Sequence, residues 1–163
     1  MDLILLEVFL ELLITINYVQ IKNMKILRLD LNGLHEYQQN RYPYLLIDVA
    51  EEVIPGKSAR GYKNLTINDW WFDVHFPGDP SMPGALQMET IVQLGALMVT
   101  TLPGNKGKVV YLTSADNLKL TKKILPGDRL DIETELLSWK RGMGKCYGAG
   151  YVNREKVQKV LKT

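Results

Sequence analysis

Residues 75–93 of the sequence, HFPGDPSMPGALQMETIVQ, hold the side chains best suited to acid–base chemistry. His75 is one of two histidines in the chain, and histidine is the residue type most often used to remove a carbon-bound proton near neutral pH. Glu89 lies within an apolar run, where a carboxylate is costly unless its pKa is raised or it faces a cavity. Together, such a base and acid could remove a proton next to a carbonyl and release a group one carbon further on.

The residues between His75 and Glu89 supply an element that can bind negative charge. Pro83 favours the start of a helix, where its missing N–H would have no partner. The free N–H groups around Gly84 then face a developing negative charge, and glycine lets a ligand approach the backbone closely. Gln93 lies one helical turn beyond Glu89 on the same face, where its amide can orient the carboxylate.

Both ionisable residues also have ordinary explanations. A salt bridge to a surface lysine at a helix edge would account for Glu89, because most glutamates are exposed. A lone histidine is more often structural than catalytic, and His35 has no second ligand with which to hold a metal. Other chemistries lack their parts, since the chain has no GxSxG elbow, GxGxxG loop, Walker loop or pair of metal-ligating histidines. The sequence predicts no metal site.

Length and composition are those of one globular domain. The chain has 163 residues, of which 46% are hydrophobic and 23% charged. Its net charge is only +2, and its basic residues are scattered, which argues against nucleic-acid binding. The single cysteine, Cys146, excludes an intramolecular disulfide and a cysteine-rich zinc site. A reducing compartment fits this usage, and we expect a cytoplasmic location.

The first 23 residues, MDLILLEVFLELLITINYVQIKN, form an apolar N-terminal extension. Asp2, Glu7 and Glu11 interrupt the apolar run, so it predicts no membrane span, and it lacks the basic start and cleavage site of a secretory signal. Two interpretations remain open. The extension is either an amphipathic helix that packs on the domain or a partner, or an upstream start ahead of a natural one at Met24. Residues 24–163 are predicted to form a single domain.

The order of the remaining patterns predicts an α+β fold. A helix over residues 83–101 is apolar on nearly every side, which indicates burial on every side. Trp70, Trp71 and Phe72 are expected to fold the preceding Pro- and Gly-rich loop onto the core. We predict a curved antiparallel β-sheet wrapped around this long central helix. The other expected elements are a short helix at 30–39 and strands at 45–53, 58–66, 109–120, 128–140, 145–152 and 156–161.

These stretches resemble the FabZ-type (3R)-hydroxyacyl-[acyl carrier protein] dehydratases, which have the hotdog fold. The resemblance is carried by HFPGDPSMPGALQMETIVQ, in which fourteen positions separate the histidine from the acid. RYPYLLID, IPGK, KNLTIND and ILPGDRLDIETELLSWKRGMGK support it. The similarity covers about residues 34–152.

The resemblance implies a homodimer with two composite sites, often assembled further into a trimer of dimers. In such a dimer His75 and Glu89 are the catalytic residues and meet across the interface. The Gly84 N–H binds the thioester carbonyl, and the acyl chain enters an apolar tunnel on the phosphopantetheine arm of acyl carrier protein, so no cofactor of the enzyme's own is implied. The substrate-binding residues are then Phe76, Pro83, Gly84 and Gln93.

The chain departs from the family pattern at a few positions. Val74 stands where the family has glycine before the histidine, and Gln39-Asn40 replaces Pro-His. Trp70-Trp71 replaces smaller or single aromatic residues. Two rival functions remain at this point, a hotdog acyl thioesterase and a non-catalytic acyl-binding hotdog subunit.

Overall fold

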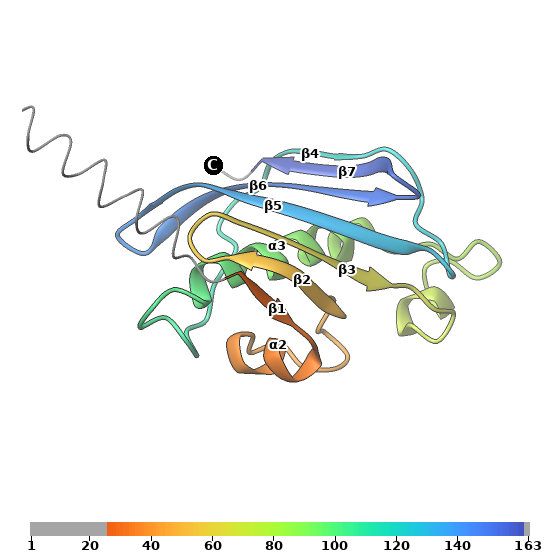
Figure 1. The fold of residues 1–163 in the computed structure, drawn as a ribbon. Helices are drawn as coiled ribbons and strands as arrows, with labels where there is room; N and C mark the ends of the chain where they lie inside the picture. The colour runs from red at the N-terminus through yellow and green to blue at the C-terminus, as the bar shows by residue number, and fades with distance from the viewer. Residues whose placement is uncertain (1–25, 162–163) are drawn as a thin grey trace, which may run out of the picture.

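A computed structural model of the chain describes residues 26–161 as a curved sheet that wraps around one long helix (Figure 1). This arrangement confirms the predicted α+β architecture. The predicted N-terminal extension, residues 1–23, lies outside the described residues. The elements are β1 (Leu27–Leu29), α2 (Leu31–Tyr37), β2 (Val49–Ile54), β3 (Ser58–Asn64), a 3₁₀ turn (Trp70–Asp73), α3 (Gly84–Thr100), β4 (Asp116–Leu120), β5 (Arg129–Lys140), β6 (Met143–Val152) and β7 (Glu155–Leu161).

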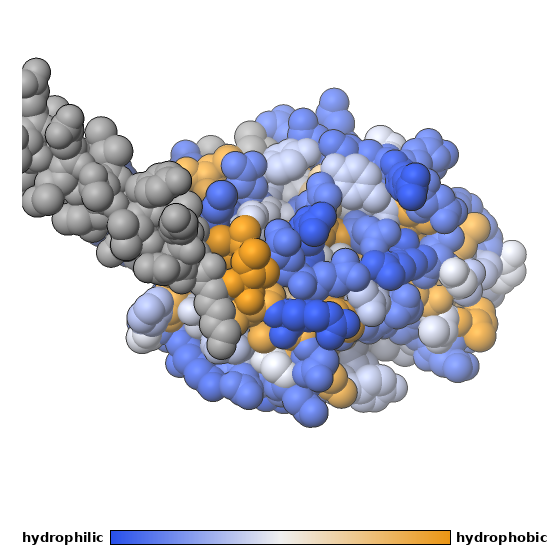
Figure 2. Space-filling view, viewed as in Figure 1, coloured by the Kyte–Doolittle hydropathy of each residue, from blue (hydrophilic) through white to orange (hydrophobic). Residues whose placement is uncertain are grey.

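All seven strands belong to one antiparallel sheet, in the order β1-β2-β3-β5-β6-β7-β4. The long strand β5 lies at its centre between β3 and β6 (Figure 1). After α3 the chain crosses to the far edge, where β4 pairs with β7. The outer face of the sheet is largely hydrophilic (Figure 2), in keeping with exposed charged side chains such as Glu51, Arg60 and Glu133.

Helix α3 forms the core together with the inner face of the sheet. Its 17 residues span about 25 Å at the usual rise per residue. Leu94, Leu97 and Met98 are completely buried, as the apolar pattern predicts. The sheet carries a small residue where the helix comes closest, since a Cβ at Gly148 would lie 2.1 Å from Ile91 Cγ2. A side chain there would push the helix away from β6.

Two expectations about the elements are wrong in part. The strand predicted at 109–120 forms only over β4, because residues 109–115 cross from α3 to the sheet edge without a neighbouring strand. The strand predicted at 45–53 begins only at Val49, because the Leu46 N–H bonds a side chain of α3 instead of a strand.

The aromatic turn also differs from expectation at one residue. Trp71 and Phe72 are buried, as predicted, but Trp70 keeps 46% of its surface exposed. The 3₁₀ turn explains the difference, because its three residues per revolution direct only part of the turn toward the core.

Candidate active site

Glu89 lies in the second turn of α3, and its side chain is half-buried. Burial raises the pKa of its carboxyl, because the charged form loses solvation. A hydrogen bond of 2.9 Å from Gln93 Nε2 to Glu89 Oε1 opposes part of that rise. The carboxyl is thereby displaced toward the neutral form that a proton donor needs.

Gln93 connects Glu89 to the loop between α2 and β2. Its Oε1 accepts the Leu46 N–H at 2.8 Å, and its Nε2 also donates to the Tyr44 carbonyl at 2.8 Å. Its own backbone carbonyl accepts a hydrogen bond from Gln38 Nε2. The amide is buried and its oxygen and nitrogen are fixed by these partners, so it reaches the carboxylate as a donor.

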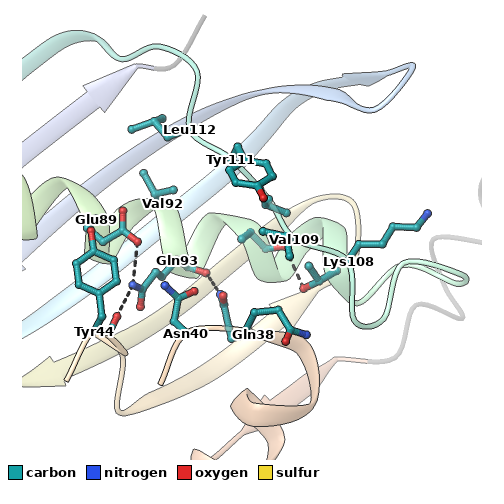
Figure 3. Close-up of a pocket in the computed structure, with 14 residues that line it drawn as sticks. Gln38, Asn40, Tyr44, Glu89, Val92, Gln93, Lys108, Val109, Tyr111 and Leu112 are labelled. Carbon is teal, nitrogen blue, oxygen red and sulfur yellow. Dashed lines mark hydrogen bonds between the residues drawn. The ribbon is translucent and has the colours of Figure 1, made fainter. Parts of the chain in front are cut away.

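Glu89 faces a cavity of about 380 Å³ between α3, the α2–β2 loop and residues 108–112 (Figure 3). Tyr44 stands beside Glu89 on one wall. Burial raises the pKa of the Tyr44 phenol, and the negative charge of Glu89 adds to that rise. The other lining residues are Gln38, Gln39, Asn40, Val92, Gln93, Ala96, Thr100, Lys108, Val109, Val110, Tyr111 and Leu112.

His75 is held by its own loop rather than by the core. Its N–H donates to the Trp71 carbonyl at 2.8 Å, and its carbonyl accepts from the Ser81 N–H at 2.9 Å. The imidazole stacks on Phe76, with ring centroids 4.1 Å apart. Nδ1 lies 2.9 Å from the Ser81 carbonyl oxygen, which can only accept, so Nδ1 carries the proton. In the neutral ring Nε2 is then the free acceptor that a base requires.

The N-terminus of α3 leaves backbone donors free of side-chain caps. Pro83 occupies the cap position and not the first helical position, and its carbonyl accepts the N–H groups of Leu86 and Gln87. Helical geometry leaves the first N–H groups, including that of Gly84, without a partner inside the helix. A Cβ at Gly84 would lie 2.4 Å from Leu120 Cδ1, so glycine also lets β4 approach this end.

The predicted site residues fall into two groups within one chain. Glu89 and Gln93 share a cavity, whereas His75, Phe76, Pro83 and Gly84 are not among the residues that line it. The Glu89 group supplies a proton donor. The His75 group supplies a base and the backbone N–H donors at the start of α3.

Three contributors were not foreseen from the sequence. Tyr44 and Asn40 line the Glu89 cavity, and the carbonyl of Ser81 fixes the His75 ring. Ser81 lies only six positions from His75, close enough for the sequence to suggest it as a partner. No local pattern could reveal Tyr44 and Asn40, because about fifty positions separate them from the residues of α3 that line the same cavity.

The departure at Val74 fits the backbone without strain. Its φ of −115° is one that any residue adopts, and its side chain is mostly exposed.

No helix within residues 26–161 is long and apolar enough to cross a membrane. The same residues contain no group of three or more His, Cys, Asp and Glu side chains placed to hold a metal ion.

Comparison with known proteins places this arrangement in a family. Residues 39–160 match the FabA-like domain. The chain is 44% identical over 119 residues to the 3-hydroxyacyl-[acyl-carrier-protein] dehydratase FabZ of Clostridium novyi, covering 70% of this chain and 84% of that protein. It is 40% identical over 131 residues to the enzyme of the same name from Enterococcus faecalis, covering 80% and 93%.

Solved structures show the same fold at lower sequence identity. An uncharacterized protein from Pyrococcus horikoshii matches with a TM-score of 0.59 at 15% identity, over 78% of this chain and 88% of that one. The dehydratase heterocomplex ApeI:P from Xenorhabdus doucetiae matches with a TM-score of 0.51 at 20% identity, over 66% and 87%.

A curved antiparallel sheet wrapped around a central helix is the hotdog fold, as the sequence predicted. Among proteins of this fold, the chain belongs to the FabA-like family, and its similarity to FabZ-type dehydratases extends over most of its length.

Proposed function

We propose that the chain catalyses dehydration of (3R)-3-hydroxyacyl-[acyl carrier protein] to the trans-2-enoyl product, in fatty acid or related lipid biosynthesis. The observation that carries the proposal is the position of Glu89 on the central helix of a hotdog fold. Its carboxyl faces a cavity beside that helix, and its pKa is raised. The FabZ relatives, at 44% and 40% identity, are named for this substrate and reaction. The acyl carrier is the proposed partner, and its phosphopantetheine arm stays with the substrate, so the enzyme adds no cofactor of its own.

The proposed mechanism separates proton removal from proton delivery. His75 Nε2 takes the C2 proton, and the electron pair moves to form an enolate-like thioester. The N–H groups at Gly84 stabilise the oxygen of that intermediate, as backbone donors do in an oxyanion hole. The pair then returns to form the C2–C3 double bond as the C3–O bond breaks. Glu89 gives its proton to the departing oxygen, so that water leaves.

A homodimer would bring together the two groups of site residues that lie apart within one chain. Glu89 and His75 do not line one cavity in a single chain, so we propose that each active site takes its histidine from one protomer and its glutamate from the other. Strand β4 supports this arrangement, because it forms a sheet edge and all five of its residues are exposed. Leu120 in that strand also lies against the start of α3, next to the proposed oxyanion donors.

Cellular location and assembly are the remaining parts of the proposal. The single cysteine, Cys146, agrees with the reducing cytoplasm in which we propose that the reaction takes place. A trimer of such dimers remains the larger assembly that the resemblance implies, and size-exclusion chromatography with light scattering distinguishes it from a dimer.

The direct test is hydration of crotonyl thioester, the reverse reaction, followed as loss of the conjugated absorbance. We expect turnover that disappears in His75→Ala and in Glu89→Gln while both variants keep the wild-type melting temperature. Release of free thiol without hydration would support the thioesterase instead. A well-folded dimer that neither hydrates nor hydrolyses thioesters of several lengths would support a non-catalytic subunit.

A further inference from the structure

The Glu89 cavity has a polar wall that the mechanism above does not use. This wall is the loop between α2 and β2, which lies opposite α3 in Figure 3. Gln38, Asn40 and Tyr44 of this loop line the cavity together with Glu89. The wall therefore lies within the space that receives the reacting part of the substrate.

The backbone of this wall is fixed on both sides of Asn40. Gln38 donates to the carbonyl of Gln93, and the Leu46 N–H donates to the Gln93 side chain. Between these anchors, Arg41 Nη1 donates to the carbonyls of Gln38 and Asn40 at 2.6 and 2.8 Å. Asn40 is thus held at a set place relative to α3.

The Asn40 side chain is the one amide of this wall that makes no hydrogen bond within residues 26–161. The amides of Gln38 and Gln39 each donate to a backbone carbonyl, whereas that of Asn40 has no hydrogen bond within residues 26–161. Figure 3 shows it projecting from the loop toward α3, on the side where Gln93 and Glu89 lie. A carboxamide offers two donors and one acceptor, and it carries no charge at any pH.

We propose that Asn40 binds the departing C3 oxygen, first as the substrate hydroxyl and then as product water. The inference rests on the proposed dehydration. When the C3–O bond breaks, its electron pair stays on the oxygen, which takes the proton of Glu89 while His75 holds the C2 proton. The resulting water needs an acceptor and a donor, and the Asn40 amide supplies both. Asn40 is also a position where the chain departs from the family pattern.

The first test compares Asn40→Ala with Asn32→Ala in the full-length protein. Asn32 is a matched control, because it is an exposed asparagine in the neighbouring helix α2 and does not line the cavity. We expect kcat for dehydration of 3-hydroxybutyryl thioester to fall about tenfold in Asn40→Ala, with little change in KM, as for loss of one hydrogen bond. Asn32→Ala should stay within about twofold of wild type.

The second test uses pH to ask whether the side chain at position 40 reaches the part of the cavity that Glu89 faces. Asn40→Asp would place another carboxylate near Glu89, and repulsion between the two would raise the pKa of Glu89. The alkaline limb of the kcat profile should then move to higher pH, because Glu89 stays protonated longer. Tyr44, Lys108 and Tyr111 are the other titratable residues that line this cavity, and they are unchanged in the variant.

The outcomes separate this inference from the function on which it rests. Wild-type kcat in folded Asn40→Ala, or equal losses in Asn40→Ala and Asn32→Ala, would overturn the role of Asn40. An unmoved alkaline limb in Asn40→Asp would overturn it as well, and this variant decides the matter if Asn40→Ala does not fold. Absence of turnover in the wild-type protein would instead overturn the dehydration.

Discussion

Glu89 is held by contacts that cross the domain, whereas His75 is held almost entirely by its own loop. The amide that binds Glu89 is anchored to Leu46 and Tyr44, which lie 47 and 49 positions away from Gln93. The backbone and ring of His75 are bonded within the stretch from Trp71 to Ser81. The acidity of the glutamate therefore depends on the whole fold, while the orientation of the histidine depends on a local loop.

The largest expected effect comes from removing either ionisable group. Glu89→Gln keeps the size of the side chain and its contact with Gln93 but loses the proton, and His75→Ala loses the base. Each should lower kcat/KM for dehydration about 10²- to 10⁴-fold, the usual range for general acid–base catalysis. Steady-state kinetics on a hydroxyacyl thioester measures the loss, with circular dichroism as the control for folding. Near-normal turnover in either variant would refute the assignment.

Gln93→Met should harm stability as well as activity, because it removes the anchor of the glutamate. The buried Leu46 N–H and the partly buried Tyr44 carbonyl would lose their partner. An unsatisfied buried group costs about 1–3 kcal/mol, so we expect the free energy of unfolding to fall by about 3 kcal/mol. The pKa of Glu89 should rise further, since the Gln93 hydrogen bond lowers it. Urea denaturation tests the first effect and the pH–rate profile tests the second.

Phe76→Ala is the matching change in the histidine loop. Phe76 is 56% exposed and stacks on the His75 ring, so its removal should free the ring without opening the core. We expect kcat/KM to fall about fivefold and the free energy of unfolding to change by less than about 0.5 kcal/mol. A loss of stability as large as that of Gln93→Met would show that this loop, too, depends on the whole fold.

The smallest expected effect is the pH dependence of stability caused by Glu89. Its pKa is raised in the folded protein, so between the ordinary glutamate range and the raised pKa the folded state binds more protons than the unfolded state. This contribution to stability is therefore full at low pH, falls as pH rises through that window, and is constant above it. Denaturant titrations at several pH values should show a flatter dependence for Glu89→Gln. An unchanged slope would contradict the raised pKa.

Local patterns predicted the local parts of this molecule well. Pro83 and the apolar run located α3 to within one residue at each end, and the Pro-Gly pair after Ile54 located the β2–β3 turn. The HFPG loop and the acid within an apolar run can be recognised in the sequence because each combines unusual residue types within a few positions.

Contacts between distant segments could not be read in this way. Asn40 and Tyr44 line one cavity with Glu89 only because the α2–β2 loop packs on α3, and no spacing in the sequence encodes that arrangement. Residues 109–115 carry a strand-like pattern, yet no strand within residues 26–161 pairs with them. The exposure of Trp70 likewise follows from the geometry of the 3₁₀ turn, not from its residue type.

The central claim is that one active site takes its histidine and its glutamate from different chains. A dimer containing one His75→Ala chain and one Glu89→Gln chain, purified through two different tags, tests it most directly. If the claim is right, one of its two sites has both wild-type groups, and the mixed dimer regains about half of wild-type activity while each parent dimer is inactive. A mixed dimer as inactive as its parents would show that both groups act within one chain and would contradict the account.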